Sequence, residues 1–386
     1  MPTATAHREA GPQPGAGPPR DPRFFKKVEN FMERVTDGME IEQLWLQLRQ
    51  DAKSGFQLYT REIDFKPVSQ RTPHDWFHVV HSFFWAVVMK LTPAKRVVLI
   101  IGLVLLLFPW SSFNASGSWF HFYGGILMLG LLVLEVADRV TMKRDLQIAR
   151  EIQSWLVPSE PPVIAGLESA FFTKPANTVA GDYYDVFYRD VPDAKNNVLI
   201  AVADVAGKSV PAALLMATFQ ASLKTLSATR SSVVGLTTGM NRYACKHSMA
   251  GARFTTAFLA EYDPDSRHLI YVNAGHNAPM LRRASGKIER LDVGGVPLGI
   301  LPDCAYESAE MDLSPGDTLL IFTDGVVEAE NDRADEYGED RLIQVFNASA
   351  GLAATEILQR LKADVQLFTG TAPQHDDITC LIAKFQ

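Results

Sequence analysis

The sequence lacks a basic charge excess, paired cysteines and a secretory leader, and each absence excludes a class of protein. Among 386 residues, 37 are Lys or Arg and 44 are Asp or Glu, which gives a formal net charge of −7. Without a basic field, nucleic acid is not expected as a partner. The three cysteines, Cys245, Cys304 and Cys380, follow no metal-ligand or redox spacing, which favours a reduced, cytosolic setting for that part of the chain.

A complete phosphate-binding P-loop is also absent. The residues AGKS at 206–209 match its second half, but Val202 stands where the loop requires its first glycine, so the backbone cradle cannot form. What remains is an apolar run ending in Asp204, a small-residue turn, and a predicted helix from Pro211 to Leu226. A lone aspartate at a strand end is more often a turn or cap residue, so the rest of the chain must decide its role.

The first 93 residues divide into a tail and a helical region. Residues 1–22 are rich in Pro, Gly and Ala without an apolar period, so we expect a disordered tail. Residues 23–93 predict helices, the last of them amphipathic and next to a membrane. His74, His78 and His81 would share one face of that helix. They could bind a metal or haem, but the aromatic residues around them favour a helix lying in the headgroup region.

Two charge-free apolar runs follow, Val97–Phe113 and Trp119–Leu134. Each approaches the ~20 residues that cross a bilayer, so residues 94–137 predict a two-helix transmembrane hairpin, with two buried core helices as the weaker alternative. Basic residues on both outer flanks place both termini in the cytoplasm and the chain in the cell (inner) membrane as a two-span protein. These flanking residues are Lys95, Arg96, Arg139, Lys143 and Arg144.

Residues 138–160 predict a connector helix. Its apolar spacing of four and three residues could pair it with a second copy of the chain, but two heptads are few, and a plain linker helix explains the pattern equally well. The spaced residues are Met142, Leu146, Ala149, Gln153 and Leu156. A cluster of prolines from Pro158 ends the helix, so we expect the C-terminal domain to cover 161–386.

The C-terminal domain mixes strand-like and helical runs. Strand-like runs are ESAFFTK, DYYDVFY, NVLIAVAD, TTAFLAEYD, HLIYVNAG, APMLRR, KIERLD, DTLLIFTD and ITCLIAKF. After the helix that begins at Pro211, we expect helices at Val233–Ser248, Glu339–Ala350 and Thr355–Phe368. Hairpin-sized strands with helices in pairs predict an α+β fold of two sheets with helices outside.

Acidic residues recur where these strands end or begin. They are Asp182, Asp204, Asp324 and the pair Asp376–Asp377. Two carboxylates about 4 Å apart repel by ~4 kcal/mol at an effective dielectric of 20, so a cluster of four needs countercharge to stay ionised. Divalent cations supply it, and an all-oxygen ligand set favours Mg²⁺ or Mn²⁺ over structural zinc.

Seven motifs stand in a family-specific order: GDYYDV, DVAGKSVPAALLMA, TTAF, NAGHNAPML, PLGI, TDGVVEA and HDDIT. Together they resemble the SpoIIE/RsbU branch of the PPM metal-dependent protein serine/threonine phosphatases, over about Glu151 to Gln386. The resemblance implies the αββα four-layer sandwich of that family. It also extends into the connector, where AREIQSWLVP is similar to the regulatory switch helix of this branch.

The resemblance also implies the site residues. Asp204, Asp324 and Asp376 match the family's metal-binding aspartates, the backbone carbonyl of Val205 matches a further ligand, and Asp182 matches the acidic residue of the first motif. These four aspartates are therefore the expected catalytic and metal-binding residues. The family's ligand is the first residue of the last pair, which leaves a supporting role for Asp377. The role of Asp185 stays open.

The implied mechanism is hydrolysis by two Mn²⁺ or Mg²⁺ ions, in which a bridging water attacks a serine or threonine phosphate in line. His276 and Asn277 are expected near the site, where they either orient strands and substrate or form a hydrogen-bonded turn.

The leading hypothesis is a membrane-anchored protein phosphatase that acts on a phosphorylated regulatory protein. The resemblance points to an anti-sigma-factor antagonist of the STAS type as substrate, in a signal-transduction pathway of a bacterium. The alternative is a catalytically silent membrane sensor or scaffold that uses the phosphatase fold to bind a partner. Loss of a ligand aspartate would mark that alternative, and none is missing. A P-loop kinase or ATPase is a third hypothesis, which Val202 weakens.

Overall fold

The computed structural model describes residues 81–82, 84–85, 88–108, 118–189, 196–230, 232–247 and 253–386. The chain forms two compact units, Met1–Val136 and Ala137–Gln386. The expected tail at 1–22, most of the N-terminal helical region, and His74 and His78 lie outside the described residues. His81 is described, and its Nε2 accepts a hydrogen bond of 2.9 Å from the Trp85 indole.

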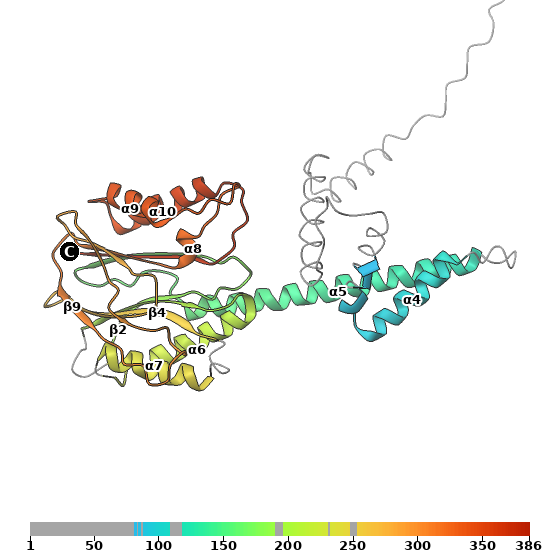
Figure 1. Cartoon of the computed structure of the whole chain (residues 1–386), viewed down its shortest axis with the longest axis horizontal. Helices are drawn as coiled ribbons and strands as arrows, with labels where there is room; N and C mark the ends of the chain where they lie inside the picture. Colours follow the sequence, from blue (N-terminus) through green and yellow to red (C-terminus); the bar gives the residue numbers. More distant parts are fainter. Residues whose placement is uncertain are drawn as a thin grey trace, which may run out of the picture. The chain divides into compact units, whose positions relative to one another are not determined.

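In the first unit, two helices pack against each other. Helix α4 spans Pro93–Leu107, and helix α5 spans Ser118–Leu156, its first half belonging to this unit (Figure 1). Near one end of the pair, Lys95 Nζ lies 3.0 Å from Glu135 Oε2. Near the other end, the ring of His121 bonds the Leu106 carbonyl at 3.0 Å. The two helices therefore run antiparallel.

Only one described helix, α5, is long and apolar enough to cross a membrane, with a mean hydropathy of 1.8 over its apolar window. Helix α4 has 15 residues and ends at Leu107, so it is about 22 Å long, whereas a bilayer core is about 30 Å thick. The described residues therefore support one span and do not support the expected second span at Val97–Phe113.

The second unit contains two sheets with helices on their outer faces, and their strands pair antiparallel except for the short parallel pair β5–β8 (Figure 1). One sheet has the order β1-β11-β10-β6-β7: Leu167–Lys174, Ile378–Phe385, Thr318–Phe322, Met280–Arg282 and Ile288–Arg290. The other has the order β2-β3-β4-β5-β8: Tyr183–Tyr188, Val198–Val205, Thr255–Asp263, His268–Ala274 and Gly294–Gly295, with β9 (Ala309–Asp312) also pairing with β5.

The helices form one pair on each outer face. Helices α6 (Ser209–Ser227) and α7 (Val233–His247) cover the β2-β3-β4-β5 sheet, and α9 (Glu339–Ala348) and α10 (Ala354–Thr369) cover the other (Figure 1). One further turn, α8 (Asp324–Val327), follows β10. The predicted α+β fold of two sheets with outer helices is confirmed. Sequence patterns missed β8, β9 and α8, which are too short to show a period.

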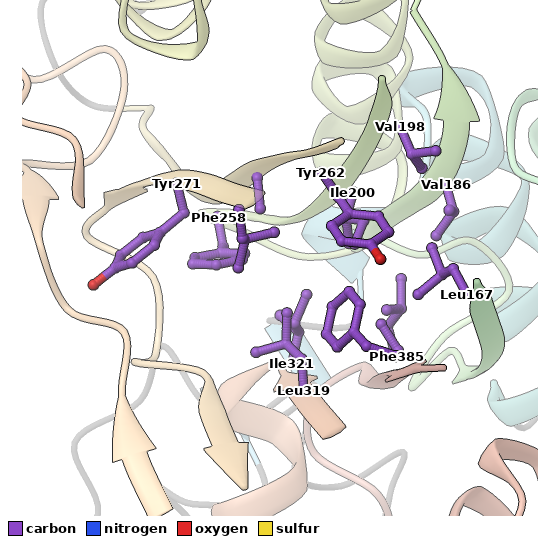
Figure 2. Close-up of a cluster of buried hydrophobic side chains, with 14 of the residues drawn as sticks. Leu167, Val186, Val198, Ile200, Phe258, Tyr262, Tyr271, Leu319, Ile321 and Phe385 are labelled. Atoms are coloured by element: carbon purple, nitrogen blue, oxygen red, sulfur yellow. The ribbon is translucent and has the colours of Figure 1, made fainter. Parts of the chain in front are cut away.

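The main core lies between the two sheets. Figure 2 shows apolar side chains from both sheets facing each other, among them Tyr262 of β4 and Phe385 of β11, whose ring centroids are 4.9 Å apart. Ile200 and Leu319 lie in the same layer and are fully buried. Two further clusters lie beneath the outer helix pairs. The two sheets are thus locked face to face, which fixes the positions of their strand ends.

A buried charge network holds the C-terminal end of α6. Arg189, which is 1% exposed, forms an ion pair with Glu261 of β4. The same guanidinium donates to the carbonyls of Ser227, at 3.2 Å, and Arg230. It therefore satisfies carbonyl groups at the helix end, which would otherwise lack partners.

Removing one partner of this buried pair should destabilise the domain. Glu261→Gln leaves the Arg189 charge buried without its carboxylate, so we expect a loss of about 3–5 kcal/mol in the free energy of unfolding, measured by chemical denaturation. The double variant Arg189→Met/Glu261→Met should lose less free energy of unfolding than the sum of the losses in Arg189→Met and Glu261→Met, because the double variant buries no unpaired charge. A loss below about 1 kcal/mol in the single variant would contradict this view of the pair.

Candidate active site

The strand order brings the acidic motifs to one end of both sheets. In one sheet, β2 pairs antiparallel with β3, and Tyr183 lies opposite Ala203, so Asp182 and Asp204 are neighbours. In the other, Phe322 of β10 lies opposite Cys380 of β11, which brings the segment after β10 beside the segment before β11. The strand ends thus carry all the expected carboxylates to one region.

Asp182 and Asp204 form the more buried part of this cluster. Asp182 is 4% exposed, and its Oδ2 accepts a hydrogen bond of 3.0 Å from the Thr323 hydroxyl. Burial, and then the charge of Asp204, raise the pKa of Asp182 well above its usual value. Burial, followed by the charges of Asp324 and Asp376, raises the pKa of Asp204 to about 7. Repulsion between carboxylates therefore contributes to the pKa of both groups.

Asp377 is held by backbone groups. Its two carboxylate oxygens accept hydrogen bonds from the N–H of Ala176, at 2.7 Å, and from the N–H of Gly181, at 2.6 Å. Burial still raises its pKa, and these N–H groups oppose that effect. Because both oxygens are engaged, Asp377 ties the loops before β2 and before β11 together, which fits a supporting role.

Asp324 and Asp376 form the more exposed part of the cluster. Asp324 is the first residue of α8, and burial and the charge of Asp376 raise its pKa. Lys208 Nζ lies 2.8 Å from Asp376 Oδ2 and also donates to the His375 carbonyl. Among the described residues, Lys208 is the cation in ion-pair contact with this cluster. One lysine cannot neutralise so many carboxylates.

The AGKS turn, residues 206–209, places the Lys208 side chain next to the carboxylate cluster. Gly207 has φ 118°, a conformation that favours glycine, and Ser209 has φ 64°, which is uncommon for a residue with a side chain. Lys208 lies between them as the N-cap residue of α6. Such strain persists only where the surrounding structure imposes it. The turn thus links the end of β3, the start of α6 and the loop that carries Asp376.

The Val205 carbonyl lies close to Gly181, the residue before Asp182. A Cβ added to Gly181 would lie 3.3 Å from this oxygen and 3.2 Å from the Cβ of Ala212. Glycine therefore allows the segment that carries Asp182 to pass close to the end of β3. The expected backbone ligand lies beside the expected side-chain ligands.

Two other candidate residues have structural roles. Asp185 lies outside the cluster, where its Oδ2 bonds Lys224 Nζ at 2.7 Å and the Tyr183 hydroxyl at 2.8 Å. His276 is buried, and its ring Nδ1 forms a hydrogen bond of 3.0 Å with the Thr256 hydroxyl. Its backbone N–H donates to Oδ1 of Asn273. Burial lowers the pKa of His276 to about 4, so its ring is neutral at physiological pH.

The His276 ring contacts Thr256, which lies opposite Asp204 in the β3–β4 pairing. It therefore supports the strands, and the half-buried Asn277 follows it in the same turn.

Sequence reasoning missed Thr323 and Lys208. Thr323 is fully buried and bonds both Asp182 and the N–H of Thr379, at 3.0 Å. Thr323 directly precedes the expected ligand Asp324 in the motif IFTDGV. Lys208 closely follows the expected ligands Asp204 and Val205 in the motif DVAGKS. A hydroxyl at the end of an otherwise apolar strand was the available signal for Thr323.

The donor set suits a hard divalent cation. Carboxylate and carbonyl oxygens converge from both sheets, and their mutual repulsion calls for positive charge. Within the described ranges, however, no three His, Cys, Asp or Glu side chains are already close enough to chelate one ion. The carboxylates instead bond Thr323, Lys208 and backbone N–H groups.

A family model and two curated relatives that match this chain agree with one another. The family model of Stage II sporulation protein E (SpoIIE) matches residues 194–386. Phosphoserine phosphatase RsbU of Bacillus subtilis (strain 168) is 28% identical over 246 residues, which cover 63% of this chain and 70% of RsbU. Phosphoserine phosphatase RsbP of the same organism is 25% identical over 195 residues, 49% of this chain and 47% of RsbP.

A solved structure supports the fold. The SiaA-PP2C domain of Pseudomonas aeruginosa superposes with a TM-score of 0.56 at 23% identity, covering 65% of this chain and 99% of that domain. At this identity the likeness concerns the fold alone.

The raised carboxylate pKa values predict a pH dependence of stability. In the folded chain, Asp204 stays protonated up to about pH 7. In the unfolded chain, where its pKa is the ordinary 3.8, it loses the proton at a much lower pH. The contribution of protonated Asp204 to the free energy of unfolding is therefore fully present below pH 3.8 and is lost as the pH rises through about 7. We expect the metal-free protein to resist urea less at pH 8 than at pH 5, and Asp204→Asn to flatten this slope.

In the same assay, Mn²⁺ should stabilise the protein more at pH 8 than at pH 5, because the ion competes with protons for the carboxylates. An equal effect of Mn²⁺ at both pH values would count against a carboxylate site.

Proposed function

The chain belongs to the SpoIIE family, and we propose that it is a metal-dependent protein phosphatase that removes phosphate from phosphoserine or phosphothreonine on a regulatory protein. The observation that carries this proposal is the convergence of four aspartates from both sheets at one end of the sandwich, where burial and the charges of neighbouring carboxylates raise the pKa values of Asp182, Asp204 and Asp324. The two relatives named as phosphoserine phosphatases support the same reaction class.

Asp182, Asp204, Asp324 and Asp376, with the Val205 carbonyl, are the residues that would hold two Mn²⁺ or Mg²⁺ ions. When bound, such ions neutralise the carboxylates, lower the pKa of water and stabilise charge on phosphoryl oxygens. Asp377 and Thr323 orient these ligands through their hydrogen bonds. Lys208 can leave Asp376 and meet a phosphate dianion, because its side chain is 55% exposed.

A groove of about 140 Å³ opens beside the cluster. It is lined by Lys208, Gly325 and Asp376 on the side of the site and by Glu328 and Glu336 farther out. Burial and the charge of Asp324 raise the pKa of Glu328, so this wall carries excess negative potential. The groove is the approach that we assign to the phosphorylated segment of the substrate. From the motif resemblance, the substrate proposed is an anti-sigma-factor antagonist of the STAS type.

Membrane attachment is proposed through the apolar first half of α5, with α4 packed against it and the phosphatase unit in the cytoplasm. If the connector helix pairs with a second copy of the chain, the contact face differs from the one that the sequence spacing suggested. Gln153, one of the spaced residues, bonds its own domain, whereas Ile148, Ile152 and Trp155 form an exposed apolar stripe at four- and three-residue steps. If the chain dimerises through α5, this stripe is the surface that we propose for it.

Activity measurements distinguish this function from a silent scaffold. Full-length protein should release phosphate from a phosphoserine protein substrate in the presence of Mn²⁺, and Asp324→Asn should lower kcat/KM by about 100-fold or more, because a ligand charge is lost. Asp312→Asn, at an exposed carboxylate on β9, is the matched control and should behave as the unmodified chain. Equal rates in the Asp324 and Asp312 variants would refute the site assignment and favour the scaffold.

Charged substitutions test the membrane span. Leu129→Arg with Leu132→Arg places two guanidinium groups on exposed positions of the apolar half of α5, at about 2.5–3.5 kcal/mol each near the bilayer centre. The unmodified chain should remain in the membrane fraction after alkaline washing, and the double variant should be extracted. Ile148→Arg, on the polar half, should stay with the membrane. Retention of the double variant would contradict a span at this position.

A further inference from the structure

The last turns of α5 hold the segment that leads to Asp182. Gln153 donates from Nε2 to the Ala180 carbonyl at 2.7 Å, and its Oε1 accepts the Ala180 N–H at 2.9 Å. One side-chain amide thus bonds both backbone polar groups of a single residue. Ala180 is 5% exposed, so water is not a ready substitute for either bond. We call this pair of hydrogen bonds the Gln153 bracket.

The orientation of Gln153 is fixed by the end of its helix. Val157, just after α5, packs against both the core between the sheets and the core beneath α6 and α7. The Tyr184 hydroxyl adds a hydrogen bond of 3.4 Å to the Pro158 carbonyl. On the opposite face, Ile152 and Trp155 are 50% and 78% exposed. Gln153 therefore lies on the face of α5 that is docked against its own domain.

The segment beyond the bracket has little room to move. The next residue, Gly181, donates its N–H to Asp377 Oδ2 at 2.6 Å. A Cβ on Gly181 would already lie 3.3 Å from the Val205 carbonyl. A shift of Ala180 would therefore move Gly181 relative to both Asp377 and Val205, and Asp182 follows Gly181 directly in the chain.

We propose that Gln153 is a positioning residue for the carboxylate cluster. The bracket sets the place of the Gly181 N–H and of Asp182, and through them the affinity of the cluster for a divalent cation. Gln153 touches neither substrate nor ion. This role deepens the proposed function and depends on it, because it supposes that the cluster binds the cation. It also gives α5 a direct contact through which a change in the docking of that helix reaches the site.

The first test is Mn²⁺ binding by calorimetry with the full-length chain in detergent. Gln153→Leu keeps a similar size and removes both hydrogen bonds, so we expect Mn²⁺ affinity to fall by about 10- to 100-fold, as is typical when a group that orients metal ligands is lost. Glu151→Gln changes an exposed side chain on the same turn of α5 and should bind within about twofold of the unmodified chain, since it alters no ligand contact.

The second test uses Gln153→Glu, which separates hydrogen bonding from packing. At about pH 7.5 the carboxylate cannot donate to the Ala180 carbonyl, so Mn²⁺ affinity should fall. As the pH falls toward the pKa of this carboxyl, ordinarily about 4.3, a growing fraction is protonated and again offers a donor and an acceptor, so the ratio of the variant's dissociation constant to that of the unmodified chain should fall toward one. In both variants, hydrogen exchange of the peptide over 176–183 should accelerate, while β3 and β11 stay protected.

The results separate the two proposals. If the unmodified chain binds Mn²⁺ and folded Gln153→Leu binds it equally well, the positioning role is wrong and the proposed function stands. If the unmodified chain binds no Mn²⁺, the metal site itself fails, and the positioning role fails with it. Should Gln153→Leu not fold, the Gln153→Glu ratio decides: a ratio that stays constant with pH overturns the proposal.

Discussion

The fold holds several carboxylates so close together that they repel one another, and this repulsion determines what the site can bind. Asp182 and Asp204 come from one sheet, Asp324 and Asp376 from the other, and the apolar core between the sheets leaves these strand ends no freedom to separate. Burial and mutual charge raise the pKa of three of these groups, and one lysine offers partial compensation. The folded chain therefore holds a region of unfavourable negative potential that a divalent cation would relieve.

The structure around this region restrains the groups that would bind the cation. Helix α6 is tied near its C-terminal end by Arg189, in its last third by the Lys224–Asp185 ion pair, and just before its first residue by Lys208. Backbone N–H groups hold Asp377, and the Gln153 bracket holds the segment before Asp182. Most of these contacts join elements far apart in sequence. The geometry of the site is thus a property of the whole second unit.

Sequence reasoning reached the fold class and the identity of the acidic motifs because both have local signals. Short apolar runs marked β3, β4 and β11, and aspartates beside glycines marked the strand ends. It could not place the buried Asp185, whose partner Lys224 lies on α6, nor find the role of Lys208, which depends on the long-range approach of Asp376. It left open whether Gln153 belongs to a dimer seam or to a plain linker helix, because a heptad pattern does not distinguish a second chain from the helix's own domain. The second span expected at Val97–Phe113 is not confirmed, because hydropathy does not show where a helix ends and the described helix α4 ends at Leu107.

The most direct measurement of the central claim is anomalous X-ray diffraction from crystals of the protein grown with Mn²⁺. The account predicts anomalous peaks at about 2.1 Å from carboxylate oxygens of both Asp204 and Asp324, with the Lys208 ammonium group displaced from Asp376. A well-ordered structure in which these carboxylates keep their present partners, with manganese bound elsewhere or nowhere, would contradict it.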